Sequence, residues 1–376
     1  MKRILKICTF ILIAVFLLEG VALSGITVNG DEGVPLSVSA ESAVLMLCQN
    51  GQVIFSKNAD TRLPMASTTK IMTAIVAIEN SDIDSTVYVH KDAVGIEGSS
   101  AYLTEAEKLT MRELLYALML QSANDAAVAI AYAVGGDIDC FVEMMNVKAS
   151  SLGLRSTHFE NPHGLDAEEH YTTASDLARI ASYALENETF REIVSTERYV
   201  TSSGKVFVNH NKMLTLYDGA IGVKTGFTKR CGRCLVSAAE REGLIAVAVT
   251  LNAPDDWEDH TKMLDYSFSA YEYKTLADDG EIAVELPCVS GDRSTVVCMN
   301  LESVRACLPK GSLVTTTIEA DRYYPAPVKK GDALATAKFY SEGELIAVVP
   351  LFARGDVKEK TGRLPLLDRI LRFMGK

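Results

Sequence analysis

Residues 67–80 have the sequence STTKIMTAIVAIEN, in which a serine precedes an apolar run at helical spacing. Because serine is a common helix N-cap, we expect Ser67 to open a helix that extends to Asn80. Side chains three positions apart share one face of a helix, so Lys70 is expected within reach of the Ser67 hydroxyl. This stretch therefore predicts a helix that begins with a serine and a lysine side by side.

A serine beside a lysine supports nucleophilic catalysis only if the lysine is uncharged. A serine hydroxyl is a poor nucleophile without a base, and at the reference pKa of about 10.4 roughly one lysine in 2,500 is neutral at pH 7. Burial and a second cation both lower the pKa of a lysine, and Lys224 is the expected second cation. Residues 64–66 (PMA) and 71–72 (IM) surround the pair and favour an inward Lys70. The alternative is a helix cap beside a solvated lysine.

A second motif, Ser122-Ala123-Asn124, lies between two apolar, Ala- and Leu-rich segments, residues 111–120 and 124–134. Ser122 is expected to pass a proton between Lys70 and a leaving amine. Asn124 is expected to hydrogen-bond both Lys70 and a substrate amide. The alternative is a pair of ordinary helix N-caps, since serine and asparagine are common in that role.

A third motif, Lys224-Thr225-Gly226, comes at the end of an apolar run that predicts a strand. Lys224 and Thr225 offer a charge and a hydroxyl to a substrate carboxylate, and Gly226 lets a substrate backbone come close. A substrate added to this strand edge would meet an oxyanion hole made by the backbone N–H groups of Ser67 and Phe227. The alternative is a simple strand-to-turn transition.

The pattern along the chain predicts an α+β fold. Asn50-Gly51 between two apolar runs indicates a hairpin, and residues 174–185 and 260–273 indicate helices. The hairpin runs are residues 43–48 and 52–55, and the runs at residues 219–224, 235–239 and 244–251 fit neighbouring strands of an antiparallel sheet. We therefore expect a catalytic domain over residues 41–275.

After residue 276, short Val, Thr and Leu runs alternate with turn signals such as Lys310-Gly311. This texture predicts a small all-β domain, a β-sandwich, over residues 276–362. The tail, residues 363–376, places apolar residues on one helical face. That pattern fits peripheral contact with a membrane and a short helix packed on its own domain equally well.

Residues 1–24 predict a cleaved export signal. Three basic residues precede an uninterrupted apolar run, residues 7–18, and Ala22-Leu23-Ser24 offers small residues to a signal peptidase. A membrane-spanning anchor is the alternative, but spanning takes ~20 apolar residues and this run is shorter. We therefore expect an exported, extracytoplasmic protein in which residues 25–40 form a lead-in.

Composition limits the class of partner. The 376 residues, 48% of them hydrophobic, suffice for two domains with a sizeable core. The net charge is -12, and loss of residues 1–24 with their three positive charges and one negative charge makes it -14. Nucleic acid is excluded as the main partner because phosphate binding needs a basic face. The six histidines show no metal-ligand spacing, so we expect neither a metal nor a cofactor.

Cys231 and Cys234 form a C-x-x-C motif. A zinc site would need a second cysteine pair or a nearby histidine pair, and a redox motif would need a surrounding βαβ pattern. The sequence has neither. A buried thiol pair or a local disulfide is therefore the favoured interpretation.

The three motifs, the loop NPHGLD at residues 161–166, YTTA at 171–174 and DGAIGVKTGFT at 218–228 resemble the low-molecular-weight penicillin-binding proteins. The likeness is greatest to the serine-type D-alanyl-D-alanine carboxypeptidases and covers about residues 40–275. It implies a transpeptidase-like core in which an antiparallel sheet meets a helical cluster, with the site between them. The later β domain and the amphipathic tail also match that family's layout.

The resemblance implies removal of the terminal D-alanine from peptidoglycan stem pentapeptides and acylation by β-lactams. Ser67 would be the acylated nucleophile, Lys70 its base, Ser122 the proton relay and Lys224 the contact to the substrate carboxylate. Two departures from the family pattern stand out. Phe227 stands where some members carry histidine, and the pairing of Cys231 with Cys234 is unusual.

Three further points bear on the site. His163 lies in the loop that borders such sites, and a histidine satisfied within its own loop is favoured over a substrate contact.

A serine β-lactamase is one rival function, but Glu168 and Glu169 lack the E-x-x-L-N pattern of a glutamate that activates water. A non-catalytic wall-binding or β-lactam-sensing module is the other, and the intact nucleophile and base argue against it.

Overall fold

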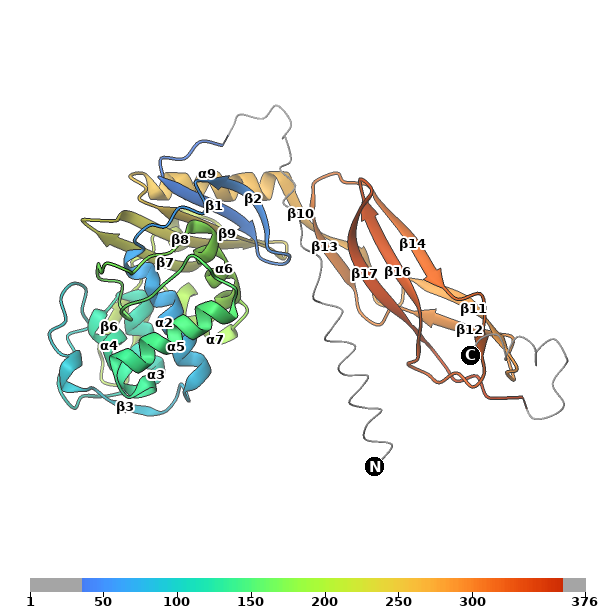
Figure 1. The fold of residues 1–376 in the computed structure, drawn as a ribbon, viewed down its shortest axis with the longest axis horizontal. Coiled ribbons are helices and arrows are strands. Elements are labelled where there is room, and N and C mark those ends of the chain that lie inside the picture. The colour runs from blue at the N-terminus through green and yellow to red at the C-terminus, as the bar shows by residue number, and fades with distance from the viewer. Residues whose placement is uncertain (1–35, 361–376) are drawn as a thin grey trace. The chain divides into compact units, whose positions relative to one another are not determined.

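The computed structural model describes residues 36–360, and both the predicted export signal and the predicted tail lie outside this range. Figure 1 shows the succession of its elements. The helices, with two short 3-10 turns η1 and η2, are η1 (Ala66–Thr69), α2 (Lys70–Asn80), η2 (Lys91–Ala93), α3 (Met111–Leu120), α4 (Asn124–Gly135), α5 (Ile138–Ser151), α6 (Ala174–Leu185), α7 (Glu188–Ser195), α8 (Met213–Leu216) and α9 (Asp256–Ala270). The strands before residue 280 are β1 (Ser42–Leu47), β2 (Gln52–Lys57), β3 (Thr86–Tyr88), β4 (Lys108–Thr110), β5 (Arg198–Val200), β6 (Val206–Val208), β7 (Ala220–Thr228), β8 (Gly232–Arg241), β9 (Leu244–Leu251) and β10 (Tyr271–Ala277).

A five-stranded antiparallel sheet, in the order β2-β1-β9-β8-β7, is the frame of the first domain. The predicted hairpin is confirmed, since β1 and β2 pair across the Asn50-Gly51 turn, where Gly51 takes a φ of +67°. Strands β7, β8 and β9 follow one another as hairpins, as the apolar runs predict. This order leaves β7 at one edge of the sheet.

Strand alternation divides the core into two layers. Val44 and Met46 of β1 face a large cluster that includes α2, α3, α4 and α6, whereas Leu45 and Leu47 face a second cluster with α9. Successive residues of a strand point to opposite faces, so a strand buried on both faces is apolar throughout. Figure 1 shows α9 on one side of the sheet and the helical cluster on the other.

The helices at the site begin where their sequences predict, with one difference. Thr110 and Glu113 form a capping box at the start of α3, and the Thr173 side chain caps α6. The prediction that Ser67 is the N-cap of α2 is wrong. Ser67 lies inside η1, whose N-cap Met65 makes no side-chain hydrogen bond, and α2 begins at Lys70.

Two strand and helix limits also differ from the sequence prediction. The third motif lies inside β7 rather than at its end, because β7 continues to Thr228 in its pairing with β8. The predicted closing helix, residues 260–273, is α9 at residues 256–270. It ends at Ala270 because the β-formers of β10, from Tyr271 on, pair with β13.

The C-terminal part is all-β, which with the sheet and helices of the first domain confirms the predicted fold class. Its strands are β11 (Ala283–Val289), β12 (Thr295–Met299), β13 (Val304–Pro309), β14 (Val314–Ala320), β15 (Tyr324–Pro325), β16 (Ala333–Ser341) and β17 (Glu344–Ala353). Six of them form a sheet in the order β14-β16-β17-β12-β11-β15, and β10 pairs with β13 in a separate ribbon. Its core includes Leu286, Phe339 and Leu351.

Candidate active site

The site is built around Lys70, the first residue of α2, whose side chain is completely buried. Its Nζ lies 2.9 Å from Ser67 Oγ in η1 and 2.7 Å from Asn124 Oδ1 in α4. The backbone carbonyl of His163 is its third hydrogen-bond partner. The structure thus brings the predicted serine, lysine and asparagine together at one amine.

Burial is the main reason that the pKa of Lys70 lies well below its usual value, because a charged ammonium loses its hydration inside the protein. The positive charge of Lys224 lowers the pKa further, and the carboxylate of Asp125 opposes the shift. This is the influence of a second cation that the sequence predicts. The environment of Lys70 therefore favours the uncharged amine that can act as a base.

Lys224 is also buried, with 1% of its surface exposed, and burial lowers its pKa to about 7. Its Nζ donates to the Thr225 carbonyl at 3.0 Å. Because β7 is an edge strand, Thr225 and Gly226 are partly accessible beside it. Lys224 therefore lies buried directly beside the accessible part of this edge strand.

Gly226 lies where β7 packs closely on η1. A Cβ at this position would lie 3.1 Å from both Ala66 Cβ and Ser67 N. The absence of a side chain lets the nucleophile-bearing turn pack directly on the strand. The next residue, Phe227, has 66% of its side chain exposed.

Ser122 and Asn124 lie at the junction of α3 and α4, and neither caps α4, whose N-cap is Ala123 without a side-chain bond. Asn124 accepts a hydrogen bond from Lys70 and donates one to the Glu97 carbonyl. Ser122 has a φ of +58° and is 6% exposed. Within residues 36–360 its hydroxyl has no hydrogen-bond partner, so a link from Ser122 to Lys70 is absent from this geometry.

The loop that contains His163 closes another side of the site. The Thr73 hydroxyl donates to the Pro162 carbonyl at 2.6 Å, and the Thr228 hydroxyl donates to Asp166 at 2.9 Å. The His163 ring accepts from the Leu165 N–H at 3.2 Å, so it is satisfied within its own loop as expected. Burial, aided by the charge of Lys70, lowers the pKa of His163 to about 4.

Two buried residues near the site, Asp125 and His170, belong to none of the three sequence motifs. Asp125 is 1% exposed, and its carboxylate accepts hydrogen bonds from the Ser100 hydroxyl and from the N–H groups of Ala101 and Leu103. His170 is 4% exposed and lies 2.8 Å from the Thr69 hydroxyl. Neither residue is predicted from the sequence; the position of Asp125 directly after Asn124 is the one signal that could have found it.

The cysteines of the C-x-x-C motif are buried, free thiols at the turn from β7 to β8. Cys231 Sγ lies 3.1 Å from the Thr228 hydroxyl oxygen, and the pKa of Cys231 is lowered to about 7 by hydrogen bonding, first of all with Cys234. This agrees with the predicted buried thiol pair.

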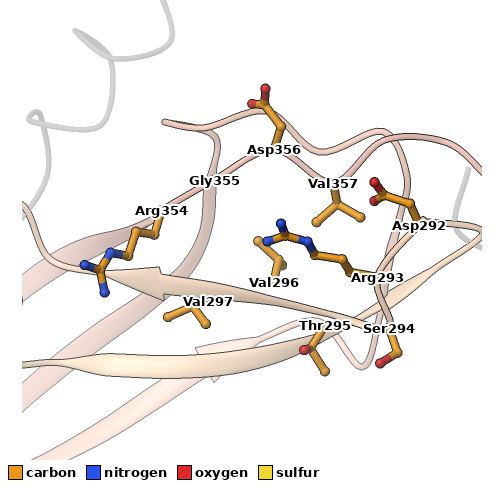
Figure 2. Close-up of a pocket in the computed structure, with 10 residues that line it drawn as sticks. All are labelled: Asp292, Arg293, Ser294, Thr295, Val296, Val297, Arg354, Gly355, Asp356 and Val357. Carbon is orange, nitrogen blue, oxygen red and sulfur yellow. The ribbon is translucent and has the colours of Figure 1, made fainter.

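A separate cavity of about 610 Å³ lies in the C-terminal domain (Figure 2). Its lining includes Arg293, Ser294 and Arg354 but no lysine, histidine or cysteine. Asp292 and Asp356 also line it, but among residues 36–360 no hydrogen bond joins the Ser294 hydroxyl to either carboxylate, whereas Ser67 is paired with Lys70.

The chain is similar to known proteins over most of its length. Residues 29–255 match the model of the D-alanyl-D-alanine carboxypeptidase family, and residues 271–359 match that of the C-terminal domain of penicillin-binding protein 5. The D-alanyl-D-alanine carboxypeptidase DacF of Bacillus subtilis (strain 168) is 33% identical over 99% of this chain and 98% of the relative.

Solved structures show the same likeness. Penicillin-binding protein 5 from Haemophilus influenzae superposes with a TM-score of 0.72 and 27% identity, over 87% of this chain and all of that one. The Streptomyces K15 DD-transpeptidase superposes with a TM-score of 0.58 and 38% identity, over 62% of this chain and 98% of that one.

Proposed function

Because this chain belongs to the D-alanyl-D-alanine carboxypeptidase family, we propose that it removes the terminal D-alanine of peptidoglycan stem pentapeptides through an acyl-enzyme on Ser67. The observation that carries this mechanism is the distance of 2.9 Å between Lys70 Nζ and Ser67 Oγ. At this separation the lysine can take the serine proton directly.

The contacts of Lys70 suit a neutral base. An uncharged amine has two N–H donors and one lone pair. Asn124 Oδ1 and the His163 carbonyl can only accept, so they take the two N–H groups. The lone pair then faces the Ser67 hydroxyl, which donates its proton as the oxygen attacks.

The reaction proceeds in two steps. Ser67 Oγ bonds to the carbonyl carbon of the penultimate D-alanine, and the bond to the terminal D-alanine nitrogen breaks as that nitrogen receives a proton. Lys70 supplies the proton, and Ser122 relays it toward the leaving amine once its hydroxyl, which has no partner among residues 36–360, turns to Lys70 in the substrate complex. Water then cleaves the ester and restores the Ser67 hydroxyl.

Substrate binding in this proposal uses the edge of β7. The substrate backbone pairs beside Thr225 and Gly226, its terminal carboxylate meets Lys224, and Asn124 holds its amide. The N–H groups of Ser67 and Phe227 receive the negative charge that develops on the attacked carbonyl oxygen.

β-Lactams are expected to acylate the same serine, and the resulting acyl-enzyme is expected to hydrolyse slowly. A β-lactamase needs a carboxylate that activates the deacylating water, and no carboxylate of residues 36–360 hydrogen-bonds to Ser67 or Lys70. Glu168 and Glu169 are exposed. The geometry therefore favours the carboxypeptidase over the β-lactamase.

The substrate also places the enzyme outside the cytoplasmic membrane, in keeping with export by residues 1–24. In the described part of the chain no helix is both long and apolar enough to cross a bilayer. We propose a catalytic domain at residues 41–275, a C-terminal β domain at 276–362 and peripheral membrane contact through residues 363–376.

The test is release of D-alanine from a stem pentapeptide by the wild type and by Ser67→Ala. The wild type is expected to release one D-alanine per peptide and Ser67→Ala none. Rapid turnover of penicillin without D-alanine release would favour the β-lactamase. Absence of both activities in a folded wild type would favour the non-catalytic module.

A further inference from the structure

A chain of buried hydrogen bonds leads from His170 to the residue that precedes Ser67. His170 Nδ1 accepts the N–H of Glu160 at 3.0 Å, and His170 Nε2 lies 2.8 Å from Thr69 Oγ1. The Thr69 hydroxyl donates to the Ala66 carbonyl at 2.8 Å. His170, Thr69 and Ala66 are 4%, 1% and 1% exposed, so water does not compete for these bonds.

The direction of every bond in this chain follows from the chemistry of the histidine. Burial, aided by the neighbouring histidines and Lys70, lowers the pKa of His170 to about 3, so the ring is neutral and carries one N–H. Because Nδ1 accepts from Glu160, that proton is on Nε2 and is donated to Thr69 Oγ1. The single hydrogen of the Thr69 hydroxyl is then committed to the Ala66 carbonyl.

The Ala66 carbonyl and the Ser67 N–H belong to the same peptide unit. In a planar trans peptide these two groups point in opposite directions, so fixing the carbonyl also fixes the direction of the N–H. That N–H has no acceptor within residues 36–360, whereas the next one along, of Thr68, donates to Met65. Ser67 N lies against β7, since a Cβ at Gly226 would be 3.1 Å from it.

The peptide needs this support because Ala66 takes a φ of +47°. A left-handed conformation costs a residue with a side chain about 1–2 kcal/mol, and it persists only where the surroundings hold it. Gly164 also packs against this carbonyl, where a Cβ would come within 2.0 Å of Ala66 O and 2.9 Å of Thr69 Oγ1. The Thr69 hydroxyl and the close approach of Gly164 both restrict the orientation of the carbonyl.

We propose that His170 is a positioning residue that acts through Thr69 and the Ala66 carbonyl to aim the Ser67 N–H at the oxyanion. This inference rests on the acyl-enzyme mechanism proposed above. His170 and Thr69 do not touch the substrate. Their effect appears in the rate of acylation, because the oxyanion forms only as the Ser67 oxygen attacks.

The test measures the acylation rate constant and the dissociation constant of the preceding complex separately, with a β-lactam as the probe. Thr69→Val keeps the shape of the side chain and removes its hydroxyl. Its acylation rate constant is expected to fall about 10- to 100-fold, because a misdirected group in the site costs up to about 100-fold. The dissociation constant is expected to change less than about threefold.

Thr68→Val is the matched control. The Thr68 hydroxyl is equally buried and donates to the Met65 carbonyl at 2.6 Å, one peptide away from the proposed chain. Its loss removes a similar bond without freeing the Ala66 carbonyl, so the acylation rate is expected to stay within about twofold of wild type. Thr69→Ser, which keeps a hydroxyl, is expected to recover most of the rate.

Two substitutions of His170 separate aiming from general support. Glutamine places an N–H donor where Nε2 lies, so His170→Gln retains the donation to Thr69 and loses the bond to Glu160. Asparagine places an acceptor where Nδ1 lies, so His170→Asn retains only the bond to Glu160. We expect His170→Gln to acylate faster than His170→Asn, and His170→Asn combined with Thr69→Val to acylate no more slowly than Thr69→Val alone.

Three results would overturn the inference. The first is an acylation rate constant of Thr69→Val equal to that of the wild type. The second is an acylation rate constant that falls as much in Thr68→Val as in Thr69→Val. The third is a loss of β-lactam affinity in Thr69→Val as large as its loss of acylation rate. If Thr69→Val does not fold, the order of His170→Gln and His170→Asn decides. A wild type that forms no adduct contradicts the proposed function instead, so the two failures are distinct.

Discussion

Lys70 on α2 and Lys224 on β7 are two buried lysines whose positive charges repel each other. Burial lowers the pKa of both, and the charge of Lys224 adds to the effect on Lys70. In our account the two amines have different tasks, since Lys70 must be neutral to accept a proton and Lys224 must be charged to bind a carboxylate. Several measurable consequences depend on this division.

Replacement of Lys224 is expected to change both binding and pH dependence. Lys224→Gln removes a charge-assisted partner of the carboxylate and should weaken binding of carboxylate-bearing β-lactams about 10- to 100-fold. It also removes the repulsion that disfavours charged Lys70, so the acid limb of the acylation rate should move to higher pH. Lys262→Gln, at an exposed lysine of α9, is the control that should change neither. An acid limb that moves to lower pH would contradict this account.

Wild-type enzyme should show a kcat/KM profile with an alkaline limb near pH 7. The pKa of Lys224 is about 7 in the free enzyme, so the cation is lost as pH rises through that value. Bound substrate supplies a carboxylate that favours the charged amine, so the limb should lie at higher pH in kcat. A substrate whose terminal carboxylate is masked as an amide is the control and should lack this limb. Identical limbs for the two substrates would exclude Lys224 as the group that titrates.

Asp125 should affect the pKa of Lys70 in the opposite sense to Lys224. Its carboxylate favours charged Lys70, so Asp125→Asn should lower the pKa of Lys70 further and move the acid limb to lower pH. The variant also weakens the bonds to Ser100, Ala101 and Leu103, and the free energy of unfolding should fall by about 2–3 kcal/mol. Chemical denaturation and the pH profile measure the two effects. Asp84→Asn, at an exposed carboxylate, should leave the acid limb in place.

Gly164 should tolerate substitution much less than a glycine of similar backbone conformation. Gly153 has a φ of +71° and open space around it, so Gly153→Ala should cost about 1 kcal/mol. Gly164 has a φ of +88°, and its Cβ would come within 2.0 Å of the Ala66 carbonyl. Gly164→Ala should therefore cost at least about 3 kcal/mol and slow acylation. Equal unfolding free energies for the two variants would show that the Ala66 carbonyl yields easily.

The motifs predict much of the site because they depend on regular spacing. The three-residue interval from Ser67 to Lys70 places the pair on adjacent turns whether the turn is 3-10 or α-helical. The run of apolar and small residues before Lys224 predicts a strand. The sequence also predicts the influence of Lys224 on Lys70, since both motifs carry a lysine toward one serine.

Other parts of the site have no signal in a single sequence. Lys70 donates to the backbone carbonyl of His163, and a backbone contact cannot be inferred from the type of side chain at that position. The left-handed conformation of Ala66 is imposed by tertiary packing, against the preference of alanine. Ser67 is of a residue type common at N-caps, but it lies inside η1, and Thr69 stands at the N-cap position of α2.

The most direct test of the account is the mass of the enzyme after incubation with a β-lactam, followed by mapping of the modified peptide. We predict one adduct, on the peptide that contains Ser67, and none on Ser67→Ala with the same fold by circular dichroism. An adduct on another residue, or an adduct that persists in Ser67→Ala, would contradict the assignment of Ser67 as the nucleophile.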